Sequence, residues 1–460
     1  MANTSVDGLI SGLGTSDVIS QLLQLERQPQ LRLQSQKSAL ATTTSAYQGL
    51  NTRFDAVLQA ATALATKDGA AWSGMKATSS DPAGLLATAR AGALPADLAV
   101  SVERLATAHT MVSETSVAGL DTAVATGPIT FTIDGTPTAA VAVGSGSLKD
   151  VVTAINGAGV GVKAAAVQVS PGQYRLQLTA TATGETGRFT VDPGSLDGLA
   201  DPSEVVPDAD AFNVLTLGVD AELRVGGAGG YPVTSSTNRF VDLLPGVDLT
   251  AVKAAPGTLI SVGVAPDVDG MTAGIEKLVT AVNAALGFIN DQSTYNPETK
   301  VKGPLLGNSL ARQLQQRLFG ALGLDLPNSS LGDIGLKLGA KGLELDKAAL
   351  AQAYASDPAK VVEAFTGAAT VAATDGLATK LVDLGNLAAK PTTGLVALAI
   401  TAMEDRARTY TRDIEAWDVR LASREATLRR QYAAMETALG TLKNQSTWLA
   451  GQISGLPAWE

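Results

Sequence analysis

The sequence contains no cysteine, and His109 is the single histidine among its 460 residues. Without cysteine the chain can form no disulfide, no thiol nucleophile and no cysteine-ligated metal site. One histidine leaves little scope for a histidine-rich metal site or for a catalytic triad. We therefore expect no cofactor, no bound metal and no enzymatic activity.

Three further absences narrow the class of protein. The formal net charge is −10, which argues against nucleic-acid binding because that function needs a basic face. No run of eighteen apolar residues occurs, so we expect no insertion into a membrane. Residues 1–26 contain neither lysine nor arginine and no apolar core of a signal peptide, so any export is expected to use another route.

Two motifs look like ligand loops but lack the necessary partners. The glycine-rich stretch 226–230 is followed by Tyr231 and Pro232, whereas a phosphate loop needs lysine and a hydroxyl residue there, so it predicts a tight β-turn. Asp267 and Asp269 begin like a calcium loop, but a third acidic ligand is missing. No pair of carboxylates stands out for acid–base catalysis.

Apolar residues recur at a strict seven-residue spacing near both ends of the chain. The C-terminal row consists of Ile414, Leu421, Leu428, Met435, Leu442, Leu449 and Leu456. The N-terminal row consists of Leu33, Leu40, Tyr47, Phe54 and Ala61, preceded by Val18, Leu22 and Leu25 at helical spacing. Heptad spacing places an apolar seam along one side of a long helix, and that seam must be buried against another helix.

Local signals set the expected limits of these helices. Residues 1–14 are polar and glycine-containing and are predicted to form a tail. Pro29 is expected to end or kink a first helix, and a second helix is expected over 31–67. Gly394 precedes a terminal helix that is expected to run to about residue 452.

The middle of the chain has the short alternating pattern of β-strands. This pattern runs from about residue 72 to 266, and Asp134-Gly135 is a hairpin signal within it. A compact β domain at 118–207 is predicted to be inserted into another built from 72–117 and 208–270. Helices return from Gly274, and Asp346 is expected to cap one of them.

Periodicity alone leaves two readings of the terminal helices open. A helical bundle within one chain would show the same spacing as an assembly between chains. The position of the two rows at opposite ends, around a middle that can fold by itself, favours assembly. The expected fold class is α+β multidomain, with long terminal α-helices pairing as a coiled coil, a helical domain and two β-rich insertion domains.

A series of short motifs, in order along nearly the whole chain, resembles the flagellar filament cap family, FliD or flagellar hook-associated protein 2. The motifs are Val6–Leu13, Val18–Leu23, Glu26–Pro29, Val102–Ala106, Ser147–Asn156, Leu244–Val247, Gly303–Leu306, Gly342–Asp346 and Gln431–Glu436. Gly14 and Gln30 depart from the family pattern, which usually has Asp and Leu at these positions.

The resemblance implies an organisation and a role. It implies a leg region at 1–42 and 404–460 and a helical domain at 43–71 and 271–403, with the two β-rich domains forming an outer plate. It implies a homo-oligomeric ring at the distal tip of the bacterial flagellum. Such a cap prevents loss of exported flagellin and promotes its folding and insertion, and some members contribute to adhesion. The implied partners are the chain itself, flagellin and hook–filament junction proteins. The implied location is extracellular, reached through the flagellar channel without a cleaved signal peptide.

We hypothesise an assembly seam on the terminal helices. Its candidate residues are Val18, Leu22, Leu25, Ile414, Leu421, Leu428, Met435, Leu442 and Leu449. The competing interpretation is a filament-forming flagellar structural protein of the flagellin or hook–filament junction type. Such a protein would also have helical termini, but it would polymerise into long fibres.

Overall fold

The computed structural model describes residues 14–192, 196–199, 212–298, 300–323, 326, 329–339, 342–367 and 375–454. It divides into two compact units, one made of Met1–Gly69 with Thr272–Glu460 and the other of Ala70–Met271. The first is built mainly from helices and the second mainly from strands, which confirms the predicted α+β multidomain fold. The predicted tail, apart from Gly14, lies outside the described residues.

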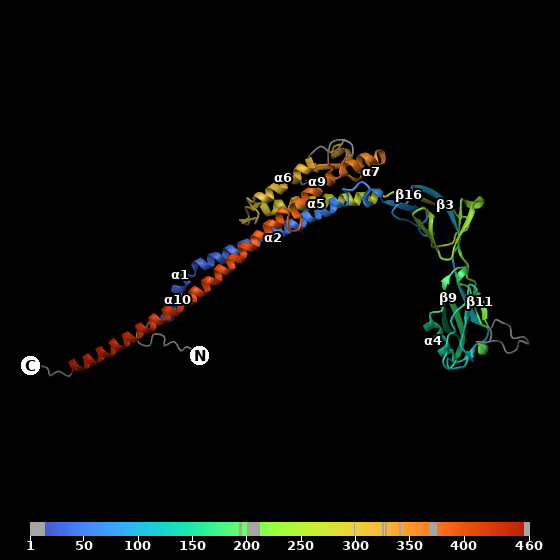
Figure 1. Ribbon diagram of the computed structural model, residues 1–460, viewed down its shortest axis with the longest axis horizontal. Helices are drawn as coiled ribbons and strands as arrows, with labels where there is room; N and C mark the ends of the chain where they lie inside the picture. Colours follow the sequence, from blue (N-terminus) through green and yellow to red (C-terminus); the bar gives the residue numbers. More distant parts are fainter. Residues whose placement is uncertain are drawn as a thin grey trace, which may run out of the picture. The chain divides into compact units, whose positions relative to one another are not determined.

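The helical unit is arranged around a few long helices (Figure 1). Its helices are α1 (Thr15–Glu26), α2 (Gln28–Thr62), most of α5 (Val268–Ser293), α6 (Ser309–Gly323), α7 (Lys347–Ser356), α8 (Pro358–Thr366), α9 (Leu377–Ala389) and α10 (Leu395–Ser454). Two small hairpins join it, β17 (Tyr295–Asn296) with β18 (Val301–Lys302) and β19 (Leu336–Gly339) with β20 (Gly342–Leu345). At 1.5 Å per residue, the 60 residues of α10 span about 90 Å.

Helix boundaries follow the local sequence signals. The break expected at Pro29 is confirmed, because α1 ends at Glu26 and α2 begins at Gln28 with the proline in its first turn. The predicted limits 31 and 67 of the second helix were wrong by a few residues at each end. The predicted cap at Asp346 is confirmed, since its Oδ1 accepts a hydrogen bond from the backbone N–H of Ala349 at 3.0 Å.

Close helix contacts inside this unit depend on two glycines. Gly49 of α2 faces the ring of Phe288 in α5, and a Cβ atom at Gly49 would lie 2.6 Å from that ring. Arg53 covers the same ring with its guanidinium 3.9 Å from the centroid. Gly385 of α9 faces Leu58 of α2 in the same way. The middle of α2 is thereby held against two other helices.

Helix α5 is apolar enough, by length and composition alone, to cross a membrane. Its interruption by Glu276 and Lys277 explains why no uninterrupted apolar run marks it in the sequence. Five of its side chains are completely buried in the protein, namely Ile275, Leu278, Val282, Ala285 and Ile289. The helix is therefore packed as a core helix of the helical unit.

The second unit contains two β cores. The first lies between a five-stranded sheet of order β1-β16-β3-β12-β13 and a three-stranded sheet of order β14-β15-β2. The elements are α3 (Ala70–Ser73), β1 (Met75–Ser79), β2 (Leu85–Ala89), β3 (Ala96–Arg104), β12 (Ala221–Val225), β13 (Tyr231–Ser235), β14 (Arg239–Leu244), β15 (Val247–Ala251) and β16 (Ile260–Pro266).

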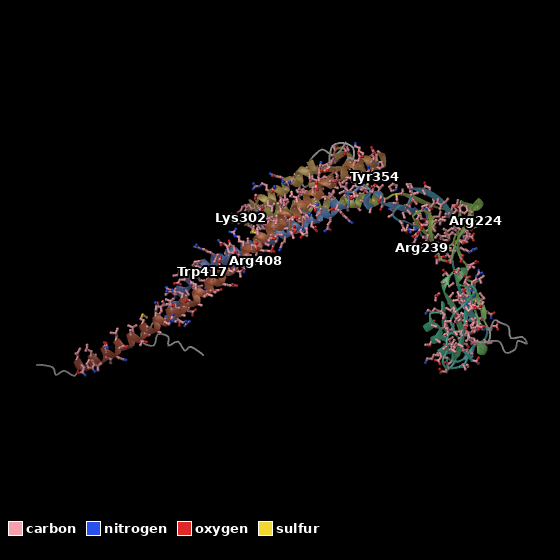
Figure 2. All side chains as sticks on the ribbon, viewed as in Figure 1. Arg224, Arg239, Lys302, Tyr354, Arg408 and Trp417 are labelled. Carbon is pink, nitrogen blue, oxygen red and sulfur yellow. The ribbon has the colours of Figure 1, made fainter. Side chains whose placement is uncertain are left out.

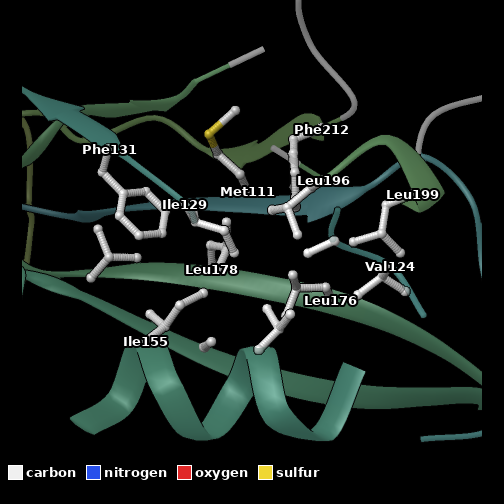
Figure 3. Packing of buried hydrophobic residues seen from close by; sticks show 14 of the residues in the cluster. Met111, Val124, Ile129, Phe131, Ile155, Leu176, Leu178, Leu196, Leu199 and Phe212 are labelled. Carbon is white, nitrogen blue, oxygen red and sulfur yellow. The ribbon is translucent and has the colours of Figure 1, made fainter. Parts of the chain in front are cut away.

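The second β core packs strands against helix α4 (Leu148–Ala158), which buries Leu148, Val151 and Ile155 (Figure 3). Its strands are β4 (Ala108–Ser113), β5 (Val117–Ala118), β6 (Phe131–Ile133), β7 (Thr136–Pro137), β8 (Val162–Ser170), β9 (Gln173–Thr183), β10 (Phe189–Val191) and β11 (Phe212–Thr216). The predicted Asp134-Gly135 turn is confirmed, with positive φ at both residues between β6 and β7.

The chain enters and leaves the second β core on neighbouring strands. Strand β4 pairs antiparallel with β11, and Met111 and Phe212 from these strands lie in the same apolar cluster. This core therefore reaches beyond the range 118–207 predicted for the inserted domain, because the entry and exit strands contribute to its sheet.

The close approach of α9 to α2 leads to a test of stability. A Cβ atom at Gly385 would lie 2.7 Å from Cβ of Leu58, so Gly385→Ala forces two helix backbones apart. We expect Gly385→Ala to lower the free energy of unfolding by about 1–3 kcal/mol. Urea unfolding followed by far-UV circular dichroism measures this change.

Gly287 supplies the matched control, because it lies inside α5 with nothing within 4 Å of a Cβ atom. There the same substitution should stabilise the helix by roughly 0.5–1 kcal/mol. Equal effects at the two positions would contradict the proposed close packing.

Candidate functional site

Helices from the two ends of the chain run side by side in what we call the leg segment, residues 15–45 and 404–454 (Figure 1). Helix α1 and the first part of α2 lie along α10. The direction is antiparallel, since Gln30 contacts Asp418 while the earlier residue Glu26 contacts the later residue Arg424. The predicted pairing of long terminal helices is confirmed.

Polar contacts hold the leg segment at the break between α1 and α2. The side chain of Gln30 is only 3% exposed, and its Nε2 donates a hydrogen bond to Oδ1 of Asp418 at 2.5 Å. One turn away, Arg424 donates from Nε to Oε1 of Glu26 at 2.9 Å. Both side chains of this ion pair are partly exposed, so its contribution to stability is small.

Beyond Leu428, burial along the predicted α10 seam decreases toward the C-terminus. Leu421 and Leu428 are 6% and 5% exposed. Ile414 and Met435 are half-buried. Leu442 and Leu449 are 60% and 55% exposed, and the nearby Trp448 and Ile453 are also exposed. Helix α10 continues beyond Thr15, the first residue of α1 (Figure 1). Its last turns therefore present apolar side chains that no other helix covers in the part of the chain that is described.

The predicted α1 residues lie on the outer side of the leg segment. Val18 and Leu22 are 36% and 38% exposed and Leu25 is 71% exposed, whereas Thr15 and Ile19 are buried. Ile19 lies two heptads before Leu33, so extending the N-terminal row backwards would have identified it. The role of the nine candidate residues in assembly stays a prediction.

Charged and aromatic side chains cover the exposed surface of α10. Figure 2 labels Arg408 and Trp417 there. The guanidinium of Arg420 lies 4.5 Å from the centroid of the Trp417 ring, and Arg429 pairs with Glu425 at 2.8 Å. These contacts join neighbouring turns of one helix and contribute a few tenths of a kcal/mol each.

The loops that resembled ligand sites have structural roles. The stretch Gly226–Gly230 closes the hairpin between β12 and β13, as predicted. Asp267 accepts a hydrogen bond from the N–H of Gly270 at 2.9 Å, and Asp269 pairs with Lys76 at 2.6 Å. Across the described ranges, no group of three or more acidic or histidine side chains could hold a metal ion.

An ion-pair cluster around a buried carboxylate joins neighbouring strands of the first β core. Asp248 of β15 is 6% exposed and binds Arg239 at 2.5 Å and Arg90 at 3.0 Å. The hydrogen bond from Arg239 holds the pKa of Asp248 below its usual range, although burial opposes this. Both arginines bind the carboxylate of Asp248, and Arg90 also binds Asp242. The cluster reads as a structural contact.

His109 lies at the start of β4 and is 4% exposed. Its Nδ1 accepts a hydrogen bond from the N–H of Gly218 at 3.3 Å, and the ring meets Phe189 edge-on at 5.1 Å. Arg188 donates to the carbonyl of the same Gly218 at 2.6 Å. Burial, followed by the nearby charge of Arg188, lowers the pKa of His109, so the imidazole is held neutral.

Comparison with known proteins covers nearly the whole chain. The family described as flagellar hook-associated protein 2 N-terminus matches residues 11–109, and its C-terminus matches residues 218–444. The flagellin hook IN motif matches residues 129–182. Flagellar hook-associated protein 2 of Escherichia coli K12 is 26% identical over 98% of both chains. A lateral flagellar hook-associated protein 2 of Vibrio parahaemolyticus is 27% identical over 75% of this chain and 76% of that protein.

One solved structure shares the fold over most of the chain. It contains the D1-D2-D3 domains of the flagellar cap protein FliD from Escherichia coli. It is 26% identical, gives a TM-score of 0.58 and covers 78% of this chain and 99% of that one.

The buried histidine gives a pH prediction. His109 has a folded-state pKa below its ordinary value of about 6.5, so its contribution to stability is fully present above pH 6.5. That contribution is lost as the pH falls from about 6.5 through the lower folded pKa. We expect the thermal midpoint of the β-rich unit to fall between pH 7 and pH 5 because protonation of Nδ1 removes the acceptor for Gly218.

His109→Gln removes the ionisable group and serves as the comparison. Its thermal midpoint should change less across this pH window. Asp248 has a lowered pKa and loses its contribution only below about pH 4, outside the window. An unchanged slope in His109→Gln would refute the assignment to His109.

Proposed function

The chain belongs to the flagellar hook-associated protein 2 family, and we propose that it caps the distal end of a bacterial flagellar filament. The observation that carries the proposal is the match of the family to both terminal parts of the chain, together with the likeness to a solved flagellar cap protein. The role is structural, and no step of it requires catalysis by this chain. The proposed location is the extracellular tip of the flagellum, reached through the flagellar channel without a cleaved signal.

We assign the parts of the chain to this role as follows. Residues 1–42 and 404–460 form the legs, and residues 43–71 with 271–403 form the helical domain that carries them. The β-rich domains, 72–117 with 208–270 and the inserted 118–207, form the outer plate. The leg assignment is supported by the antiparallel pairing of α1 and α2 with α10. The plate assignment is supported by the two β cores.

The gradient of burial along α10 supports a docking role for the legs. Leu421 and Leu428 are buried within the chain, whereas Leu442 and Leu449 are more than half exposed. Burying one leucine side chain contributes about 1.5–3 kcal/mol. Several such contacts with the filament end would hold a leg, while each contact alone is weak enough to exchange as a new subunit enters.

We propose that several copies form a ring whose partners are flagellin and hook–filament junction proteins. A ring at the tip would retain exported flagellin long enough for it to fold and insert. We further propose an adhesive role for the outer plate, which binding of the purified protein to host surfaces would test.

The competing function is a flagellar protein that polymerises by itself, and the match to a flagellin hook motif gives it some support. The cap is favoured because the match to hook-associated protein 2 spans 98% of both chains. Electron microscopy of the purified protein distinguishes the two functions. Closed rings or plates are expected, and long fibres would contradict the cap.

The docking role can be tested on the exposed end of the seam. Leu442 is 60% exposed, so Leu442→Asp leaves the fold intact while placing a charge where we expect contact with the filament. We expect docking to weaken about tenfold or more, with short filaments and flagellin released into the medium. Filament length by electron microscopy and secreted flagellin by immunoblot measure the outcome. The half-buried Met435→Asp should act in the same direction.

Asn444→Asp is the control, since it adds the same charge on the opposite side of the same turn. It should support normal elongation. If Leu442→Asp and Met435→Asp filaments also elongate normally, the apolar row does not dock the cap.

A further inference from the structure

Gln30 is a buried polar residue on the side of α2 that faces α10. It lies four residues after Glu26 and three before Leu33, in the inner rows of the heptad pattern that faces α10. Its side chain is only 3% exposed to solvent. A buried amide needs a hydrogen-bond partner, so what Gln30 bonds to determines which helix can lie beside it.

The amide nitrogen of Gln30 donates to two acceptors on α10. Nε2 donates to Oδ1 of Asp418, and the carbonyl of Ile414 lies 3.5 Å away on the same side. Both acceptors belong to a single turn of α10. A buried amide that loses its partner keeps the full cost of leaving water, so this pairing discriminates between helices that carry an acceptor at this height and helices that do not.

The surroundings of Gln30 make such discrimination necessary. Along α2 no side chain from 31 to 45 is buried, and along α10 none from 397 to 420 is buried. Next to Gln30 the paired helices therefore leave their facing side chains only partly buried. Apolar side chains on the outer side of the same region, Val18, Leu22, Leu25 and Leu31, are exposed and offer a surface to any other apolar helix.

We propose that Gln30 is a specificity-determining residue of the leg segment, which through Asp418 favours pairing of α2 with α10 over association with the exposed apolar face of α1 from other copies of the chain. A foreign apolar helix at this position would leave the amide unpaired. That penalty corresponds to roughly a tenfold to a hundredfold shift in the pairing equilibrium. A polar residue at an inner heptad position is known to fix partner and oligomeric state at some cost in stability. The inference goes beyond the proposed function and does not rest on it.

The first experiment compares Gln30→Leu with Gln36→Leu in the full chain. Gln36 is exposed on the same helix, so Gln36→Leu makes the same chemical change outside the seam. Sedimentation velocity measures the concentration at which chains associate. We expect Gln30→Leu to melt at a higher temperature than the wild type and to associate at a concentration at least tenfold lower.

Gln36→Leu should associate as the wild type does. If Gln30→Leu associates at the same concentration as Gln36→Leu, Gln30 does not determine specificity and the proposal is overturned. A lower melting temperature of Gln30→Leu would overturn it as well, because the amide would then be needed for stability rather than for partner choice.

The absence of cysteine allows the site of association to be identified. Gln21 is exposed on α1, and Gln21→Cys carries the only thiol in the chain. With a spin label there, double electron–electron resonance reports distances between the legs of different chains. Combined with Gln30→Leu, this label should show a new short distance that is missing with Gln36→Leu. Association without such a distance would place the contact outside the leg and overturn the proposal.

Asp418 provides a second, independent test of the pairing. Asp418→Ala leaves the buried amide without its partner and should lower the melting temperature, whereas Asp418→Asn keeps a carbonyl acceptor and should restore most of it. The double variant Gln30→Leu/Asp418→Ala should recover stability but associate like Gln30→Leu. If Asp418→Ala melts as the wild type does, Asp418 is not the partner and the proposal fails. These measurements use purified protein, so a failure of the capping function in cells leaves them unaffected.

Discussion

The fold of the helical unit depends on apolar residues from the two ends of the chain being buried against each other. A single long helix with an apolar face is unstable in water. Helix α10 has three buried residues, Val396, Leu421 and Leu428. Helices α1 and α2 supply the cover over part of its length, which brings segments about 390 residues apart in sequence into contact. The middle of α2 is then held in place by helices that follow later in the chain, with Gly49 and Gly385 permitting the close approach.

Much of the fold could be predicted because its signals are local. Heptad spacing identified α10, Pro29 marked the break between α1 and α2, and Asp134-Gly135 marked a hairpin. The faces of α1 were harder to assign. Val18, Leu22 and Leu25 have helical spacing, but the buried residue is Ile19, which shares the heptad phase of Leu33 in α2. Spacing within a short helix shows that an apolar stripe exists but does not show which stripe is covered.

The candidate site was predictable in composition and only partly in geometry. The row from Ile414 to Leu449 forms one stripe, yet the sequence contains no sign of where its burial stops, because that depends on the length of the partner helix. The contact of Gln30 with Asp418 was also invisible, since it joins residues distant in sequence and breaks the apolar rule that identifies the seam. The extent of the second β core depended similarly on the pairing of β4 with β11.

That pairing has a consequence for how such a chain can change. Because the entry strand β4 and the exit strand β11 are hydrogen-bonded neighbours, the two ends of the inserted part lie next to each other. A module whose ends meet can be lengthened, shortened or replaced without altering the path of the chain on either side. The inserted β core is thus free to diversify in evolution while the remainder of the molecule keeps its architecture.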